Sequence, residues 1–162
     1  MSSCNRRLFL TLPLALAACG FQPAFGPQGV AQGLRGTIRA ADPTDRNGHA
    51  LVDRLENRLG RPEVARYDLA YTLQTAPVGV GITTDNSITR YNLTGSVDWT
   101  LTDRATGARV TGGRAENFTS WTATGTTVAG VAAEEDATRR LMVILADQIV
   151  MQLLAAAPRL AP

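Results

Sequence analysis

The sequence predicts an α/β fold: a two-layer sandwich with about four strands in a mixed or antiparallel sheet and two helices packed on one face. Three observations predict it. Residues 42–59 and 128–156 repeat apolar side chains at helical spacing, residues 67–121 alternate apolar and polar side chains as strands do, and a short alternating segment, 34–40, comes first. The expected order is β-α-β-β-β-α, and 162 residues leave room for one domain.

The N-terminus has the features of an export signal. Arg6 and Arg7 precede an apolar run, residues 8–18, which is too short to span a bilayer as a stable helix. Leu16-Ala17-Ala18-Cys19 matches the bacterial lipobox, so we expect cleavage before Cys19 and a diacylglycerol on its thiol. Gly20 stands where Asp often marks inner-membrane retention, which favours the outer membrane. The arginine pair also fits a twin-arginine signal, so the general and twin-arginine export routes stay open.

Removal of the signal peptide, residues 1–18, changes the charge and the cysteine count. The remaining 144 residues hold 14 arginines, no lysine and 14 acidic side chains, so their formal net charge is zero. This balance argues against a polybasic protein that binds nucleic acid. Cys19 is the one cysteine left, which excludes an intramolecular disulfide and a cysteine-based metal site, and no cofactor is expected. Residues 19–33 are expected to be an acylated tether, 34–157 the domain and 158–162 a tail.

The first strand and the first helix are expected within residues 34–60. Residues 34–40 alternate as a strand does. Asp42 and Pro43 are expected to cap and open the helix, with Asp45 in its first turn, where the helix dipole favours an anion. Gly60 and Pro62 are expected to end it. The predicted buried stripe consists of Leu51, Val52, Leu55 and Leu59.

Three further strands are expected between residues 67 and 121. The second strand begins at Tyr67, and after Pro77 its apolar positions slip by one residue, which predicts a bulge. Residues 83–87 are expected to form a polar turn and 91–101 the third strand. Residues 103–107 are a short hairpin connection ending in Gly. The fourth strand is expected over 108–121, with a bulge at Gly112-Gly113.

The last helix is expected over residues 128–156. Asp147, Gln148 and Gln152 interrupt its apolar second half without partners apparent from the sequence, which favours a buried core helix over a membrane span. Ion pairs four residues apart are expected for Glu135 with Arg139 and Asp136 with Arg140. The predicted core stripe consists of Ala133, Ala137, Leu141, Ile144, Leu145, Ile149 and Leu153.

The chain offers no recognisable active site, so we predict that it is not an enzyme. The only histidine, His49, lies in the first turns of a helix and is expected at its surface. Gly79-Val80-Gly81 is weak evidence for phosphate binding because no helix start follows it. What remains is binding, for which arginines on the strands are candidates, although they also fit charges that limit edge-to-edge aggregation. These candidates are Arg90, Arg104, Arg109 and Arg114.

Several features, taken in order, carry a resemblance to a known family. They are the Cys19-Gly-Phe start, the strand that begins Arg90-Tyr-Asn-Leu-Thr-Gly, the turn from Leu101-Thr-Asp103 to Gly107, and the spacing of Ala133, Ala137, Leu141 and Leu145. Together they resemble the LptE family of lipopolysaccharide-assembly lipoproteins, in its α-proteobacterial branch. The resemblance implies a lipid-anchored protein on the periplasmic face of the outer membrane. It would plug the LptD β-barrel, help that barrel assemble and assist lipopolysaccharide transport.

The resemblance also implies partners and sites. The partners are LptD, lipopolysaccharide and, through the anchor, the membrane. Candidate lipopolysaccharide contacts are Arg90, Arg109 and Arg114, the last two on position alone. The candidate barrel contact is the loop Thr83, Thr84, Asp85, Asn86 and Ser87. Polar strand residues that would suit the outer surface of a plug are Thr94, Thr100, Thr102, Asn117 and Thr119.

Two other classes of protein remain open from sequence. An accessory or pilot lipoprotein of a different outer-membrane machine, such as a secretin or a phospholipid transport complex, would also be small and without an active site. A cell-wall hydrolase would use carboxylates such as those at 134–136, but these acids sit on the polar side of a helix near its N-terminal half, where solvated dipole partners are the simpler interpretation.

Overall fold

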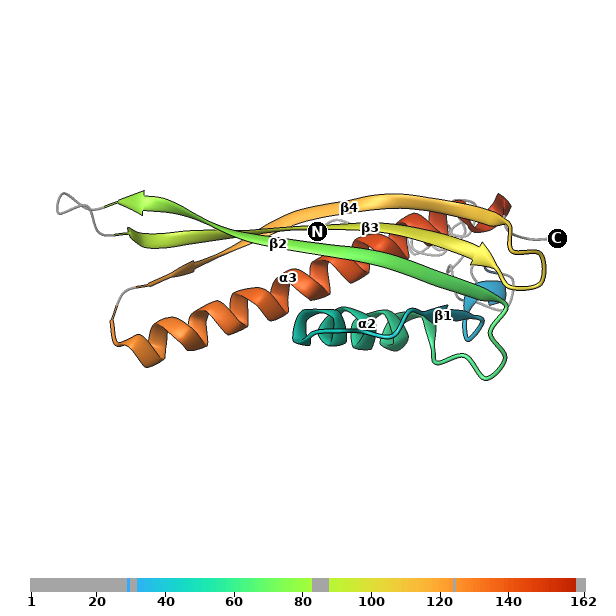
Figure 1. Ribbon diagram of the computed structural model, residues 1–162, viewed down its shortest axis with the longest axis horizontal. Coiled ribbons are helices and arrows are strands. Elements are labelled where there is room, and N and C mark those ends of the chain that lie inside the picture. Colours follow the sequence, from blue (N-terminus) through green and yellow to red (C-terminus); the bar gives the residue numbers. More distant parts are fainter. Residues whose placement is uncertain (1–28, 30–31, 83–87, 124, 160–162) are drawn as a thin grey trace, which may run out of the picture.

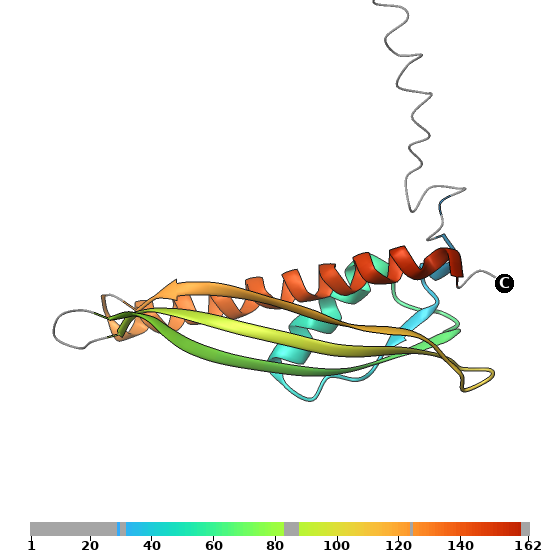
Figure 2. The same ribbon diagram turned by 90° about the horizontal axis from the view of Figure 1, so that it is seen from above.

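The computed structural model describes residues 29, 32–82, 88–123 and 125–159, and its architecture is the predicted β-α-β-β-β-α sandwich. The four strands form one sheet in the order β1-β2-β3-β4, with β1 parallel to β2 and the other pairs antiparallel. Both helices cover the same face, and the longer one follows the sheet along most of its length (Figures 1 and 2). The elements are η1 (Gln32–Leu34), β1 (Ile38–Ala40), α2 (Arg46–Leu59), β2 (Tyr67–Ile82), β3 (Ile88–Asp103), β4 (Arg109–Thr122), α3 (Thr127–Ala156) and η2 (Ala157–Arg159).

The first strand and the start of the first helix differ from expectation. Leu34 lies in the short helix η1 rather than in β1, and is buried. The expected cap at Asp42 and Pro43 is wrong: Asp45, in extended backbone, caps α2 by accepting a hydrogen bond from the Gly48 amide at 2.6 Å. Asp45 satisfies an amide that would otherwise be unpaired at the helix start, so the helix begins after it.

The apolar stripe of α2 and the position of its end are confirmed. The stripe is buried against the sheet and α3, and the helix ends at Gly60, which has φ 80°. The Gly60 amide donates to the Glu56 carbonyl at 2.7 Å, and the positive φ is the conformation that glycine reaches without a Cβ clash. The buried stripe residues are Leu51, Val52, Leu55 and Leu59.

The second strand has a bulge, but it lies beyond its predicted position directly after Pro77: Val78 still pairs regularly with Asn92, and it is exposed because it faces away from the helices. β2 pairs regularly with β3 until Gly79 faces Tyr91, then shifts between Gly79 and Gly81. β1 covers β2 only at residues 67–69, so the rest of β2 is a sheet edge. Pro77 lies in that edge portion, where a strand tolerates a residue without an amide hydrogen.

The bulge in the fourth strand lies two residues from its predicted position. Gly112 and Gly113 pair regularly with Thr100 and Trp99, whereas the register shifts where Leu101 faces Thr111 and Thr102 faces Arg109. The extra residue of β4 is therefore Val110. The two glycines have a different role: a Cβ at Gly112 or Gly113 would lie within 3 Å of a neighbouring side chain.

The long helix α3 has two buried rows where the sequence predicted one. The predicted stripe packs on the sheet, although Ala133 and Ile144 are only half-buried. A second row, Met142, Ala146 and Val150, is fully buried and faces α2. No helix in the described part of the chain is long and apolar enough to cross a membrane.

Two of the three polar residues in the second half of α3, Asp147 and Gln152, have partners from other elements. Asp147 accepts hydrogen bonds from Arg54 on α2 at 2.8 and 3.0 Å and pairs with Arg58 at 3.4 Å. Gln152 bonds to β3 and β4, whereas Gln148 Oε1 is buried without a hydrogen-bond partner among the described residues. These contacts explain how a buried helix accommodates polar side chains that would be energetically unfavourable inside a bilayer.

Candidate functional site

No described helix or strand covers the face of the sheet opposite the helices. Figure 2 shows both helices on one side of the strands and none on the other. Alternation along β3 turns Trp99 and Leu101 toward the helices and Asp98, Thr100 and Thr102 outward. We call this outward surface the open face; it carries mainly hydroxyl, amide and charged side chains from β2, β3 and β4.

Thr119 does not belong to the open face, contrary to the sequence-based expectation. Its side chain is buried beneath α3 and donates to the Ala137 carbonyl at 2.9 Å. Asn117 pairs with Gly95, whose missing side chain faces Leu141 of α3, so it also lies on the helix side. Thr94, Thr100 and Thr102 do face outward, at the positions that alternate with the buried residues of β3.

The four candidate arginines fall into two groups. Arg114 pairs with Asp98 at 3.1 Å and with Glu116 at 3.4 Å, and Arg104 pairs with Asp68 at 3.3 Å. Their charges are therefore neutralised by neighbouring carboxylates, which fits the alternative of balanced sheet-face charges.

Arg90 and Arg109 have no acidic partner among the described residues. The one hydrogen bond of the Arg90 side chain, to Ser120 Oγ, is long at 3.5 Å. Arg90 faces Thr122 in the register and Arg109 faces Thr102, so the two arginines lie near opposite ends of the open face. Twelve residues of strand separate the two positions, which is about 40 Å.

Exposed apolar side chains accompany Arg90. Val78 pairs with Asn92, which in turn pairs with Ser120, the residue that Arg90 contacts. Ile88 and Phe118 lie at the same end and expose 42% and 59% of their surfaces. This end therefore combines apolar surface with a cation that no described acid neutralises, a combination that suits an anionic amphiphile.

Two predicted sites lie outside the described residues. One is the candidate lipidation site, Cys19. The other is the candidate barrel-contact loop, which consists of Thr83, Thr84, Asp85, Asn86 and Ser87. The structure does describe both flanks of the loop: β2 ends at Ile82 and β3 begins at Ile88, at the end of the sheet far from β1 (Figure 1).

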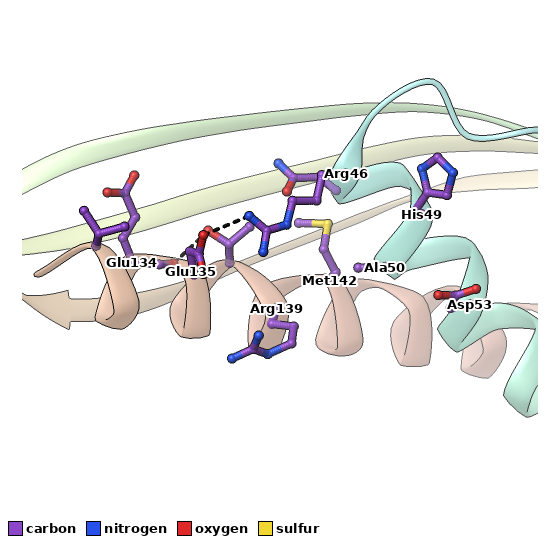
Figure 3. Close-up of a pocket in the computed structure, with 11 residues that line it drawn as sticks. Arg46, His49, Ala50, Asp53, Glu134, Glu135, Arg139 and Met142 are labelled. Carbon is purple, nitrogen blue, oxygen red and sulfur yellow. Dashed lines mark hydrogen bonds and ion pairs between the residues drawn. The ribbon is translucent and has the colours of Figure 1, made fainter. Parts of the chain in front are cut away.

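A cleft of about 440 Å³ lies between the first half of α2 and the first half of α3 (Figure 3). Arg46 reaches across it to Glu135 at 2.8 Å, and this contact lowers the pKa of the glutamate. The expected pair of Glu135 with Arg139 is thus replaced, whereas Asp136 does pair with Arg140 at 2.9 Å.

The cleft does not assemble catalytic groups. His49 is one of the residues that line it, and a ring nitrogen lies 2.7 Å from the carbonyl oxygen of Asp45, the residue that caps α2. No group of three or more potential metal-ligating side chains occurs in the described residues. The cleft is lined by acids and arginines in similar numbers, so it selects neither an anion nor a cation.

The open sheet face, with its hydroxyl and charged side chains, is suited to binding other molecules. The fold and this face therefore indicate a binding protein. The chain belongs to the LptE family, because residues 36–153 match the family described as "LptE: Lipopolysaccharide-assembly". It is thus a non-enzymatic lipopolysaccharide-assembly lipoprotein of the outer membrane that partners with LptD, as the resemblance implied. Family membership also removes the hydrolase and pilot-protein alternatives.

Solved structures support the same fold. A putative lipoprotein from Caulobacter crescentus is 24% identical, with a TM-score of 0.66 over 80% of this chain and 96% of that one. The rare lipoprotein B from Shewanella oneidensis is 14% identical, with a TM-score of 0.59 over 76% of this chain and 96% of that one. A minor lipoprotein from Acinetobacter baumannii is 19% identical, with a TM-score of 0.53 over 74% and 89%. A search of curated proteins found no match.

Proposed function

We propose that this lipoprotein sits inside the LptD barrel as a plug and contacts lipopolysaccharide through the open face, principally at Arg90. The observation that supports the proposal is an arginine that has no acidic partner in the described part of the chain and lies beside exposed Val78, Ile88 and Phe118. A guanidinium suits the phosphates of lipopolysaccharide, and the apolar side chains suit its acyl chains. Arg109 is a further candidate contact, and Arg114 a weaker one because two carboxylates already engage it.

We propose that Cys19 carries the lipid and that residues 19–33 link it to the domain. From Cys19 to Gln32 the chain spans 13 residues, which reach at most about 45 Å. Arg90 lies at the other end of the sheet from the β3–β4 turn and η1 (Figure 1). The anchored end would then face the membrane leaflet that holds the lipid, while Arg90, near the start of β3, would lie away from the anchor.

The decisive experiment is affinity purification of the tagged, lipidated protein from outer membranes, with mass spectrometry of what is retained. LptD recovered one to one, together with lipopolysaccharide, is expected. Arg90→Gln should reduce the retained lipopolysaccharide several-fold without reducing LptD. Arg104→Gln is the matched control, since it removes another exposed arginine that is already paired with Asp68. Equal losses from both variants would contradict the role of Arg90.

The loop is tested in the same preparation. Deletion of residues 83–87 should weaken co-purification with LptD, because the proposal places this loop against the barrel wall. The flanking strands stay paired through Gly79 and Tyr91, so the sheet should survive the deletion. Unchanged recovery of LptD would remove the loop from the interface.

A further inference from the structure

A hollow on the open face, near the β3–β4 turn, contains a cation, Arg109, that has no acidic partner among the residues the structure describes. It has a volume of about 420 Å³ and lies over the first half of β2, the second half of β3 and the first half of β4. Arg109 projects into it, and Thr72 and Thr100 contribute hydroxyl groups to its wall. Neither hydroxyl has a side-chain hydrogen bond to another described residue, so both are available to a ligand.

Arg109 faces this hollow because of the β-bulge at Val110. Thr111 pairs with Leu101 and therefore shares the helix side of the sheet with that buried leucine. In a regular strand Arg109, two residues earlier, would point the same way. The extra residue instead pairs Arg109 with Thr102, an outward position, which is how a bulge redirects a side chain.

Gly112 makes room for the guanidinium close to the sheet. A Cβ built on Gly112 would lie 2.6 Å from Arg109 Nη2 and 2.8 Å from the Trp99 carbonyl oxygen. A larger residue would therefore displace the arginine from the hollow. The bulge and the glycine act together, one turning the side chain outward and the other leaving the surface concave beneath it.

The charges around the hollow leave Arg109 as the group that needs a counterion. Asp98 also borders the hollow, but Arg114 already binds its carboxylate at 3.1 Å. Arg104, at the adjacent turn, is engaged by Asp68. A free guanidinium flanked by hydroxyl donors is an arrangement that binds phosphate or carboxylate oxygens.

We propose that this hollow binds an anionic saccharide unit, carrying phosphate or carboxylate, as a second contact for the lipopolysaccharide head group. This inference rests on the proposed function. The separation of about 40 Å from Arg90 means that the two arginines cannot hold the same phosphate. The open face would then have two anion sites, one at each end, separated by the neutralised Arg114.

Saturation-transfer NMR with the full lipidated chain in detergent micelles tests the chemistry of the hollow. The probes are glucose 1-phosphate and glucuronate, with glucose as the uncharged control. Transfer to at least one anionic sugar is expected to exceed that to glucose, and whichever sugar responds identifies the anion as phosphate or carboxylate. Arg109→Gln should lower the signal to the level of glucose, whereas Arg104→Gln should leave it unchanged. Transfer that persists in Arg109→Gln, or that is equal for all three sugars, would overturn the proposal.

Photo-crosslinking in cells separates this proposal from the function on which it rests. A photoreactive residue at Thr72 reports on the hollow, and one at Ser120 reports on the Arg90 end. Crosslinks to lipopolysaccharide are expected at both, with Arg109→Gln removing only the one from Thr72. A crosslink at position 120 alone would refute the second site. No crosslink to lipopolysaccharide at either position would refute lipopolysaccharide binding by the open face altogether.

Discussion

Trp99 and Gln152 join the sheet to the long helix through a single hydrogen bond. The indole Nε1 of Trp99 on β3 donates to Gln152 Oε1 at 2.8 Å, and Gln152 Nε2 donates to the Arg114 carbonyl on β4 at 2.9 Å. Gly113 leaves space for this amide, because a Cβ there would lie 2.9 Å from Gln152 Oε1. One side chain of α3 thus satisfies polar groups on two strands, which fixes the rotation of the helix relative to the sheet.

Replacing Gln152 by Leu should destabilise the domain by about 1–3 kcal/mol. The change leaves the Trp99 indole nitrogen without its partner, and an unsatisfied buried donor costs more than the lost bond itself contributes. Urea unfolding monitored by tryptophan fluorescence measures the effect. Gln148→Leu is the control: its Oε1 is already buried without a partner among the described residues, so its removal should be close to neutral. Similar losses from both would show that volume, not hydrogen bonding, dominates.

Asp147→Asn should weaken the contact between α2 and α3 and lower the midpoint of urea unfolding slightly. Asp147 receives two hydrogen bonds from Arg54 and a longer contact from Arg58. About a third of the Asp147 and Arg54 side chains is exposed, so solvent screens the pair and keeps its contribution modest. The loss should shrink in 1 M salt, which can be read from urea unfolding at both ionic strengths. Asp136→Asn, at a more exposed pair, should cost less; a larger cost there would contradict this ranking.

The sequence predicted the order of elements because its apolar periodicities are long and unbroken. Leu51, Leu55 and Leu59 define the buried face of α2, and the alternation around Trp99 defines β3. The cap was misplaced because Asp42 and Asp45 are equally good capping residues in sequence, and only the backbone selects Asp45. The second row of α3, with Met142, was missed because it depends on α2 packing beside it, a contact between distant segments.

The site was predictable only in outline. Sequence identified Arg90, Arg104, Arg109 and Arg114 as one set, but pairing depends on which strand lies opposite each residue. The register places Asp98 beside Arg114 and Asp68 within reach of Arg104, which leaves the other two without acids among the described residues. The bulge was assigned to Gly112-Gly113 because the apolar–polar alternation is poor there, whereas its observed place at Val110 follows from pairing that local sequence does not encode.

Gly95→Ala should destabilise the domain by about 1–3 kcal/mol by separating α3 from the sheet. A Cβ at Gly95 would lie 2.9 Å from Leu141 Cδ2 and 3.1 Å from Leu145 Cδ1, both fully buried. Overpacking of this kind forces side chains from their preferred rotamers. Gly130→Ala, within α3, meets nothing within 4 Å and should stabilise by about 0.5–1 kcal/mol through helix propensity. Thermal unfolding of both variants checks the signs, and a neutral Gly95→Ala would show that α3 can shift without cost.

Asp103 should make the stability of the domain depend on pH in the acid range. Hydrogen bonds from Thr106 and Ala105 and the nearby Arg66 lower the pKa of its carboxyl group in the folded state. Because the folded pKa lies below the unfolded one, the carboxylate stabilises the fold above the unfolded pKa, near pH 4, and this contribution is lost as the pH falls through the folded pKa.

The test is the melting temperature from pH 6 to pH 2 for the wild type, Asp103→Asn and a control. At pH 6 the Asp103→Asn protein should melt at a lower temperature than the wild type. The difference should shrink as the wild-type carboxyl becomes protonated, because residue 103 is then uncharged in both the wild type and the variant. Glu63→Gln is the control, because Glu63 is exposed and forms no ion pair with a described residue. A constant difference between wild type and Asp103→Asn across the whole range would mean that the turn depends on the shape of the side chain and not on its charge.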